Sequence, residues 1–515
     1  MNAPAPLAAG PDDDPSGGPW PLPVGWCWTS THAVAAINPP TNFDTLDPAS
    51  EIPFIPMAAV AEETGKIDLS ARRPKREVAK GYVRFMEGDV IFAKITPCME
   101  NGKVAPVVGL PGEHAAGSTE FHVFRPAATD QRYLWYWLVG RGFRGRAKRN
   151  MSGSAGQLRV PVDWLRKADF PLAPLAEQRR IVARMDALFA EVAEGEAALA
   201  EARKGLGTFR RALLKAAVTG ELTKDWRTAN LKSETGHELL SRIATARATK
   251  APAKARRRRN ADAQPLDTYN LTELPEGWAW ATVDEVKTGH QRNGISIPGT
   301  PSPPGVKAMR LDALTARGLN LNAVRYIPLP EDRIQDYRVN SGDLLISRAN
   351  GSPEFVGRAV YVADIGETVV FPDTIIRYPL GADQQIGWWI ELAWNSPFGR
   401  SQIQRLAKTT AGILKISQED IAQIALPIPP PAEAAEILRR VSDALTAADD
   451  TLAMLDAEAA DAARLKQSML KAAFEGRLVP QDPADEPANA MLTRLKANHS
   501  APEPAGRRRR PKVTQ

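Results

Sequence analysis

The feature of this sequence that most constrains its fold is an internal repeat that spans most of the chain. The segment LLKAAVTGELT, which begins at Leu213, returns 256 residues later as MLKAAFEGRLV from Met469, with six of eleven positions identical. Further matches pair LPVGWCW with LPEGWAW (22–28 and 274–280), EGDVIFAKI with SGDLLISRA (87–95 and 341–349), and GQLRVPVDWL with GILKISQEDI (156–165 and 412–421). Such a repeat in 515 residues predicts two similar units in tandem.

The first part of each copy predicts a mixed α/β domain. Short β-rich runs such as DVIFAKI, FHVFRP, DLLISR, AVYVAD and TVVF alternate with Gly- and Pro-rich turns, and aromatic helical stretches follow them. The offset of the repeat changes through this part, as insertions in loops would produce. Because Trp and Tyr at helical spacing are typical of core packing, we expect the aromatic helices to be buried rather than to stack on bases.

The last part of each copy predicts a long helix. In the first copy, apolar residues recur every seven positions from Met185 to Leu213, and in the second copy they step by fours and threes from Val441 to Met469. A helix of about 40 residues would be roughly 60 Å long, and two such apolar seams would bury each other.

Glycines mark special positions in both predicted helices. Gly195, Gly205 and Gly207 interrupt the first helix and predict a bend or fraying there. Gly220 and Gly476 stand where a left-handed residue ends a helix, so they predict the two helix stops.

We therefore expect an α+β fold with two mixed α/β domains in a pseudo-twofold tandem repeat, separated by two long antiparallel coiled-coil helices. The predicted boundaries are, in order, a disordered leader (1–19), the first domain (20–173), its helix (174–223), a basic linker (224–270), the second domain (271–429), its helix (430–480) and a disordered basic tail (481–515).

Composition restricts the class of protein. The net charge of +6 is a weak indication of a nucleic-acid partner, and the basic residues cluster at 72–80, 141–149, 254–259 and 507–512. The last two clusters are typical of a solvated linker and tail. Cys27 and Cys98 have no neighbouring histidine, which predicts neither a disulfide framework nor a zinc site. No signal peptide or membrane-spanning pattern occurs, which predicts a cytoplasmic protein.

Motifs for catalysis are incomplete in this sequence. INPPT at 37–41 is similar to the Asn-Pro-Pro-aromatic signature of amino-methyltransferases, but Thr41 stands at the aromatic position and no Gly-rich cofactor loop accompanies it. No G-x-x-x-x-G-K-[ST] loop and no H-E-x-x-H motif occur. Asp89 and Asp343 each follow a glycine and are predicted to cap a turn that enters a strand. The chain is therefore predicted to recognise a partner without catalysing a reaction.

Both copies resemble one known family. The segments LPEGWAW, SGDLLISRANGSPEFVGRAV, ALPIPPPAEAAEI and LKQSMLKAAFEGRLV, with their counterparts in the first copy, resemble the DNA-specificity subunits of type I restriction-modification systems over residues 20–480. Ala434 departs from the family's usual Gln. The resemblance implies two target-recognition domains that each read one half of a split site in double-stranded DNA, and helices that separate them and dock two modification subunits. It places S-adenosylmethionine and adenine methylation on those subunits, ATP and Mg²⁺ on a further restriction (motor) subunit, and no cofactor on this chain.

Candidate DNA contacts lie on and beside the loops that follow the GD strands. We expect base contacts from polar residues of these loops, namely Lys94, Thr96, Glu100, Asn101 and Lys103 in the first copy and Ser347, Arg348, Asn350 and Ser352 in the second. Ordinary turn chemistry is the alternative for each. We expect phosphate contacts from Arg144, Arg146, Lys148 and Arg149, and from Arg400, Arg405, Lys408 and Lys415.

Contacts with the modification subunits are expected from the outer faces and ends of the long helices, namely Glu177, Gln178, Leu214, Lys215, Leu470, Lys471 and Phe474. The seam residues Leu199, Leu206, Leu452 and Leu455 are instead expected to pack between the two helices. Two alternatives stay open: a coiled-coil scaffold with incidental DNA affinity, and a self-sufficient methyltransferase, against which the missing cofactor loop counts.

Overall fold

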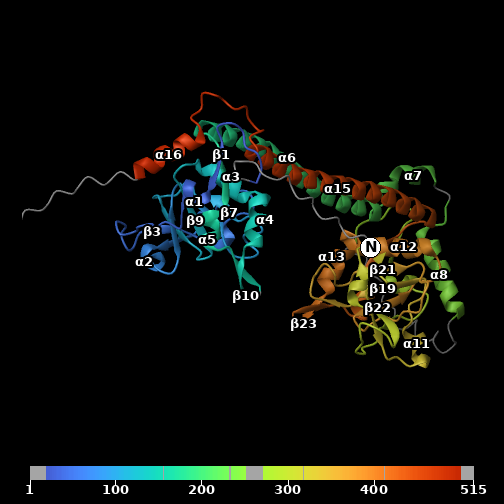
Figure 1. Ribbon diagram of the computed structural model, residues 1–515. Coiled ribbons are helices and arrows are strands. Elements are labelled where there is room, and N and C mark those ends of the chain that lie inside the picture. Colours follow the sequence, from blue (N-terminus) through green and yellow to red (C-terminus); the bar gives the residue numbers. More distant parts are fainter. Residues whose placement is uncertain are drawn as a thin grey trace, which may run out of the picture. The chain divides into compact units, whose positions relative to one another are not determined.

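The computed structural model describes residues 19–154, 156–230, 233–250, 271–316, 318–410 and 412–499 (Figure 1). It consists of two compact units, one formed by Met1–Leu199 with Ala457–Gln515 and the other by Ala200–Asp456. Each unit contains one copy of the mixed α/β domain and a part of both long helices. The expected fold of mixed α/β domains with long helices is confirmed.

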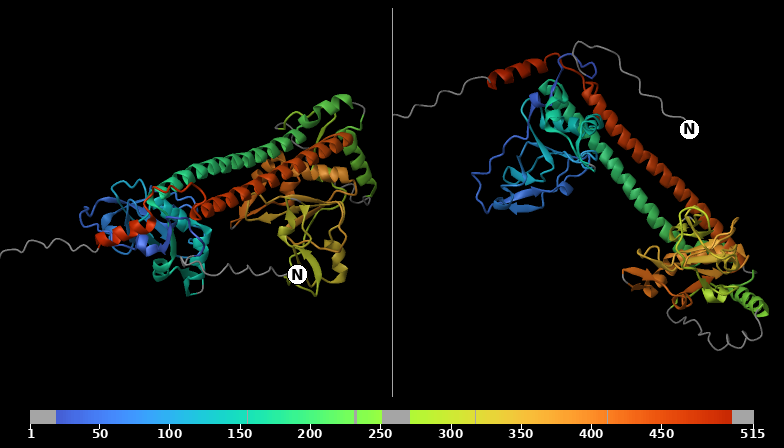
Figure 2. Two further views of the ribbon diagram at one scale, coloured as in Figure 1. Left: turned by 45° about the horizontal axis from the view of Figure 1, so that its top comes forward. Right: turned by 60° about the horizontal axis from the view of Figure 1, so that its bottom comes forward.

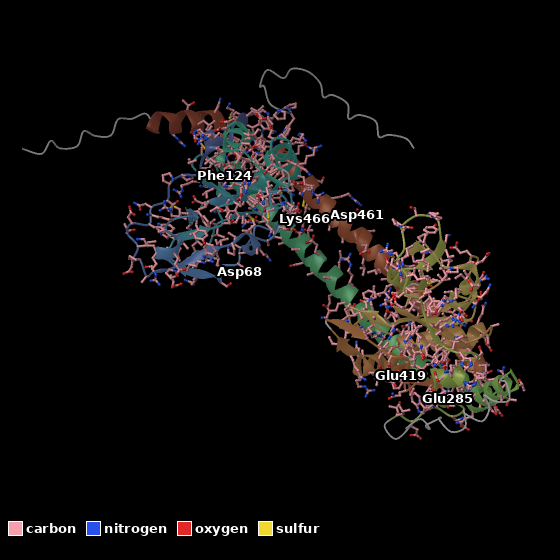
Figure 3. The ribbon with its side chains drawn as sticks, turned by 90° about the horizontal axis from the view of Figure 1, so that it is seen from below. Asp68, Phe124, Glu285, Glu419, Asp461 and Lys466 are labelled. Atoms are coloured by element: carbon pink, nitrogen blue, oxygen red, sulfur yellow. The ribbon has the colours of Figure 1, made fainter. Side chains whose placement is uncertain are left out.

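The first domain is built on a four-stranded antiparallel sheet with the order β2-β9-β6-β7, whose strands are Ala35–Ile37, Phe121–Pro126, Val90–Ala93 and Val104–Pro106. Strand β6 is buried at all four positions, as its continuous apolar run predicts. Phe124 of β9, labelled in Figure 3, lies in the main core with the aromatic helix α3 (Gln131–Val139), where Trp135 and Tyr136 are also buried.

A second four-stranded sheet extends the first domain. Its order is β4-β3-β8-β5, and its strands are Arg72–Pro74, Glu51–Ile55, His114–Gly117 and Val83–Met86. Helix α2 (Lys75–Val78) follows β4 directly. One face of this sheet packs on the main domain through Ile55, Ala115 and Phe85.

The second domain repeats the central sheet with the order β14-β22-β19-β21, whose strands are Arg292–Asn293, Ile375–Pro379, Asp343–Ser347 and Ala359–Val362. Its aromatic helix α12 (Gln384–Asn395) buries Trp389 and Trp394, whereas Trp388 is 42% exposed. The run TVVF is not a strand, because Val370 makes only isolated bridges to Ala308 and Arg338. A hairpin of β15 (Val306–Met309) and β18 (Val324–Ile327) stands beside it.

Helices α6 (Leu175–Val218) and α15 (Pro431–Phe474) are each continuous over 44 residues. The parts that belong to each unit lie side by side (Figure 2). In the unit of the first domain, Lys466 of α15, labelled in Figure 3, binds Glu196 of α6 at 2.8 Å. In the other unit, Arg203 binds Asp456 at 2.5 Å and Arg210 binds Asp449, so the helices pair antiparallel there through a narrow seam with ionic members.

The glycine predictions have different outcomes. Fraying at Gly195, Gly205 and Gly207 is wrong, because α6 is helical through all three. Nothing lies within 4 Å of the Cβ positions of Gly195 and Gly205, so these glycines serve no close packing. Gly220 and Gly476 have φ values of 73° and 68°, which confirms that left-handed residues end both helices.

Each long helix is joined to its domain by a buried carboxylate. The indole Nε1 of Trp26 donates to Glu177 Oε2 at 2.9 Å, and that of Trp278 donates to Glu433 Oε2 at the same distance. Burial raises the pKa of the Glu177 carboxyl. A short antiparallel pair flanks each joint, β1 with β12 (Cys27–Ser30 and Asp169–Leu172) and β13 with β25 (Ala279–Thr282 and Ala425–Ile428).

The two joints differ at the next position. The buried amide of Gln178 donates to Ala173 O and accepts bonds from Thr129 Oγ1 and Asp130 N, which fixes the start of α3. Its counterpart Ala434 is apolar and packs in the core of the second domain.

The segments predicted as a basic linker and a disordered tail are partly structured. Residues 224–250 include α7 (Lys224–Ala229) and α8 (Gly236–Lys250), and 481–499 include α16 (Ala488–His499), so the prediction of disorder is wrong for 481–499. Helices α8 and α16 form because their apolar residues reach domain cores: Leu239 packs in the second and Met491 in the first. Residues 1–18 of the predicted leader (1–19) and the basic clusters at 254–259 and 507–512 lie outside the described residues.

The joint carboxylates generate a stability prediction. Glu433 also accepts bonds from Thr223 Oγ1 at 2.7 Å and Arg227 Nε at 3.0 Å, so Glu433→Ala leaves the buried Trp278 indole and Thr223 hydroxyl, and the part-buried Arg227 Nε, without this acceptor. We expect a loss of about 3 to 5 kcal/mol in the free energy of unfolding, measured by urea denaturation. The control Arg439→Ala, whose side chain is 60% exposed, should cost at most about 1 kcal/mol. Equal losses for both variants would contradict the assignment.

Candidate nucleic-acid interface

The loop that joins β6 to β7 in the first domain, residues 94–103, is held against a hairpin. This hairpin consists of β10 (Ser152–Ser154) and β11 (Gln157–Arg159) and projects beyond the rest of its domain (Figure 1). Thr96 N donates to Leu158 O at 3.0 Å, and Leu158 N donates to Thr96 Oγ1 at 3.2 Å. The loop therefore stands on a defined exposed support.

The second domain repeats this arrangement with a different loop sequence. Residues 348–358 join β19 to β21, and β20 (Ala349–Asn350) within them pairs with β24 (Ile413–Lys415), which in turn pairs with β23 (Lys408–Thr410). The backbone bonds at the loop entrance are equivalent. Lys94 N donates to Glu120 O and Arg348 N to Thr374 O, and the carbonyls of Lys94 and Arg348 accept from Val160 N and Ile416 N, the residues directly after the two hairpins.

The predicted base contacts of the first domain divide into two groups. Lys94 and Thr96 are half-buried, Glu100 pairs with Lys148 at 2.5 Å, and exposed Asn101 donates to Glu62 Oε1 at 2.9 Å. The prediction that Lys103 contacts a base is wrong, because its ammonium donates to the carbonyls of Val60 at 2.9 Å and Met57 at 3.3 Å. It therefore holds a neighbouring turn in place.

In the second domain, the prediction that Ser347 contacts a base is wrong. Its side chain is 2% exposed at the end of β19, and its hydroxyl points into the protein. Arg348, Asn350 and Ser352 are half-buried on the loop, where Asn350 Oδ1 accepts from Ser352 N at 3.0 Å. These three residues lie together on one support.

The predicted phosphate contacts of the first domain lie on α4 (Arg141–Arg149). Lys148 and Arg149 are exposed, whereas Arg144 is 6% exposed and donates to Val139 O, Glu100 O and Glu63, so its assignment as a phosphate contact is wrong. Arg146 is half-buried over the ring of Trp137 at 5.1 Å, and burial lowers the pKa of its guanidinium.

The second domain shows the same division. Arg400 of α13 (Pro397–Leu406) donates to the carbonyls of Val356 and Pro353 at 2.8 Å each, so it braces the loop instead of facing a phosphate. Arg405, Lys408 and Lys415 are exposed. Lys408 lies 3.9 Å from Asp420 and is 82% exposed.

Most predicted partner contacts lie inside the domains. Glu177, Gln178, Leu470 and Phe474 are buried, so their assignment to an outer surface is wrong: the helix ends insert into the cores. Leu214 is half-buried against the second core, and Lys215 and Lys471 are exposed. Sequence reasoning missed three exposed apolar side chains of these helices, namely Phe209 (46% exposed), Met454 (69%) and Leu465 (48%). Met454 and Leu465 are apolar but lie outside the predicted seam. An apolar residue outside the seam is the sequence signal that could have predicted an exposed apolar side chain here.

The two strand-entry aspartates act as predicted. Asp89 Oδ2 accepts from Met86 N at 2.9 Å and Asp343 Oδ2 from Asn340 N at 2.7 Å, which confirms both turn caps. Asp89 also pairs with Arg125 at 2.7 Å, whereas the nearest Arg377 nitrogen is 3.9 Å from Asp343. Burial accordingly raises the pKa of Asp343 to about 6.

Neither a methyltransferase motif nor a metal site is formed by the described residues. Asn38 of INPPT accepts from Val123 N at 2.9 Å and contacts the His122 ring, and Thr41 is buried, so the segment packs at the end of strand β2. No three His, Cys, Asp or Glu side chains gather in the described part of the chain as a metal site would require. Over the same residues, no helix is both long and apolar enough to cross a membrane.

The bracing arginines generate a prediction about loop mobility. Removing the guanidinium in Arg144→Ala or Arg400→Ala should free the adjacent carbonyls, so backbone amides of 100–102 or 353–358, respectively, should exchange hydrogen faster. Hydrogen exchange with mass spectrometry measures this, and the exposed Arg149→Ala serves as the control. Unchanged exchange in both loops would show that these arginines do not hold them.

Comparisons with known proteins agree with this architecture. The profile of the type I restriction modification DNA specificity domain matches residues 38–202. The specificity subunit of the type I restriction enzyme EcoKI, from Escherichia coli strain K12, is 30% identical over 448 residues, which cover 81% of this chain and 86% of that protein. The EcoEI specificity subunit of Escherichia coli is 25% identical over 504 residues, covering 88% and 84%.

Two solved structures share the fold. A chain from the structure titled "Structural basis underlying complex assembly and conformational transition of the type I R-M system" aligns with a TM-score of 0.63 at 21% identity, covering 89% of this chain and 100% of that one. The HsdS subunit of Thermoanaerobacter tengcongensis aligns with a TM-score of 0.50 at 20% identity, covering 89% and 99%. With the identity to the EcoKI subunit over most of both sequences, the chain belongs to the family of type I restriction enzyme specificity subunits.

Proposed function

We propose that this chain gives a type I restriction-modification complex its DNA sequence specificity, with each domain reading one half of an asymmetric, bipartite site. The observation that carries the proposal is one scaffold used twice with two different loops. Residues 94–103 and 348–358 leave equivalent strands and rest on equivalent hairpins, yet their sequences differ in length and at most positions. Because the two domains share one scaffold but carry different loop sequences, we expect them to recognise different half-sites.

Base contacts are assigned to the loop residues whose side chains are at least partly exposed. In the first domain these are Lys94, Thr96, Glu100 and Asn101, and in the second Arg348, Asn350 and Ser352. Arginine and lysine pair with guanine edges, asparagine with adenine, and glutamate with the amino group of cytosine. Each domain therefore presents a mixed donor and acceptor set to the major groove.

Phosphate contacts are assigned to the exposed cations beside these loops, namely Lys148, Arg149, Arg405, Lys408 and Lys415. Such contacts position a protein on the duplex without specifying sequence, and they make affinity depend on salt.

The long helices are proposed to set the spacing of the half-sites. A duplex turns once in about 10.5 base pairs, or roughly 34 to 36 Å, so readers held by helices of constant length engage half-sites at one separation and one rotation. Insertions or deletions in α6 and α15 should therefore change the spacer length of the site while both half-sites are kept.

The chemistry is proposed to lie on the partners. Two modification subunits would bind S-adenosylmethionine and methylate adenine, and a motor subunit would use ATP and Mg²⁺ to cut DNA. This chain would then be a non-catalytic subunit without a cofactor of its own, and it would act in the cytoplasm, where the host DNA lies. The incomplete methyltransferase motif at 37–41 supports this division.

Methylome sequencing tests the specificity. A host that expresses this chain with its modification subunits should carry N6-methyladenine on both strands of one asymmetric split motif, and deletion of the chain should abolish it. The double variant Arg348→Ala, Asn350→Ala should alter only one half of the motif, while the Arg149→Ala control should keep both halves. Methylation that is unchanged by deletion would refute the proposal.

A second prediction concerns the docking of the modification subunits. Met454 is 69% exposed on α15, and Phe209 is 46% exposed on α6, so we expect both apolar side chains to be covered in the complex. Met454→Glu and Phe209→Glu should weaken co-purification of the modification subunits at least tenfold in apparent affinity. Ala460→Glu adds the same charge to α15 at a different exposed position and should have little effect. Undiminished binding by both variants would exclude this surface.

A further inference from the structure

The second sheet of the first domain carries a group of cations that the proposed function does not use. Six basic residues lie on and beside strands β4 and β5 and helix α2, and we call them the lobe cations: Arg72, Arg76 and Lys80, which are exposed, and Arg73, Lys75 and Arg84, which are half-buried.

Strand register places two of these residues on the outer face of the sheet. Arg73 stands opposite Ile52, and Arg84 stands opposite Ala116, which is itself paired with Phe54. Paired residues project to the same side of a sheet. The opposite face packs against the main domain, so Arg73 and Arg84 lie on the outer side.

Aromatic rings hold these arginines in place. The Arg73 guanidinium lies 4.0 Å from the Phe54 ring centre and donates to Tyr82 OH at 3.0 Å, and Arg84 lies 5.5 Å from the Phe43 ring centre. Stacking against a ring restricts the side chain without neutralising its charge.

The charges of the lobe cations are not compensated by ion pairs. Among the described residues, no carboxylate lies within 4.0 Å of a basic nitrogen of any lobe cation, although Glu77 is on the same helix and Asp44 and Asp47 are on the covering loop. The hairpin region of the second domain contrasts with this: Lys307 pairs with Glu367, and Arg310 pairs with Asp312 at 3.0 Å.

The lobe is tied to the candidate recognition loop of its own domain. Glu62 and Val60, which follow β3, accept bonds from Asn101 and Lys103 of that loop. Val60 is eight residues after Ile52, which stands opposite Arg73, and an extended chain of that length spans at most roughly 28 Å. The distance between Arg73 and the loop is therefore at most comparable to about one turn of duplex, roughly 34 to 36 Å.

We infer that the exposed lobe cations, Arg72, Arg76 and Lys80, bind phosphates of the DNA that flanks the half-site read by the first domain. The inference rests on the proposed function, because the recognition loop must lie on DNA for the lobe to reach the flank. Phosphate is favoured over an acidic protein surface because this sheet is tied to a loop that is itself proposed to lie on DNA, and because the cations spread over a strand and a helix. The contact is sequence-independent, and we do not extend it to the β15/β18 strand pair of the second domain, where Lys307 and Arg310 have carboxylate partners.

The test uses the complex of the full chain with its modification subunits and a duplex that contains the methylated site. The triple variant Arg72→Ala, Arg76→Ala, Lys80→Ala removes only exposed side chains, so the fold is kept. We expect the slope of log K against log salt to fall by up to about 2.7, since each phosphate contact contributes about 0.9. The matched control, Arg242→Ala, Lys307→Ala, Arg333→Ala, removes three cations that already have acidic partners.

The methylated motif should be identical for wild type and both variants. Trimming the duplex outside the first domain's half-site should weaken wild-type binding and leave the triple variant unaffected, whereas trimming the other end should affect both equally. A slope that falls no more than in the control overturns the inference, as does weaker binding of the modification subunits with an unchanged slope. If the wild-type complex shows no preference for the methylated site, the proposed function fails. The slope comparison still tests whether the lobe cations bind phosphates.

Discussion

The buried bond between a tryptophan indole and a glutamate carboxylate is the interaction on which the rest of the structure depends. Glu177 and Glu433 stand in the first turn of their helices and accept from Trp26 and Trp278, which enter from the beginning of each domain. A buried carboxylate is costly unless its oxygens are all satisfied, so this bond imposes one geometry on the junction of helix and domain. Any loop that a domain carries is thereby held in a defined relation to its own helix.

Periodicity and repetition predicted the scaffold well. The heptad of apolar residues predicted both long helices, and Gly220 and Gly476 predicted where they stop, because only a few residue types adopt the left-handed conformation there. The turn caps at Asp89 and Asp343 were also predicted, since a short carboxylate at the start of a strand can accept from a backbone amide of the preceding turn, here three residues earlier. These signals are local, and local signals can be read from one sequence.

The candidate site was predicted less well, because burial of a polar group depends on distant chain segments. Arg144 and Arg400 look like surface cations in sequence, yet each donates to carbonyls about 45 residues away. Ser347 ends a strand that is buried on every side. Leu470 and Phe474 belong to a helix end that inserts into the first domain, a contact that spans more than 300 residues of sequence. No sequence pattern within a helix predicts a contact with so distant a segment of the chain.

The insertion of the C-terminal segment into the first domain has a consequence for biosynthesis. Leu470, Phe474 and Met491 pack in the same core as Trp26 and Tyr133, so the first domain has its complete core only after nearly the whole chain has been made. The second unit, Ala200–Asp456, is complete earlier. At about 5 to 20 residues per second, the roughly 260 residues between the two parts of the first unit take about 13 to 50 s to synthesise. During that interval the core of the nascent first domain lacks Leu470, Phe474 and Met491, and a ribosome that stalls before Leu470 leaves this core incomplete.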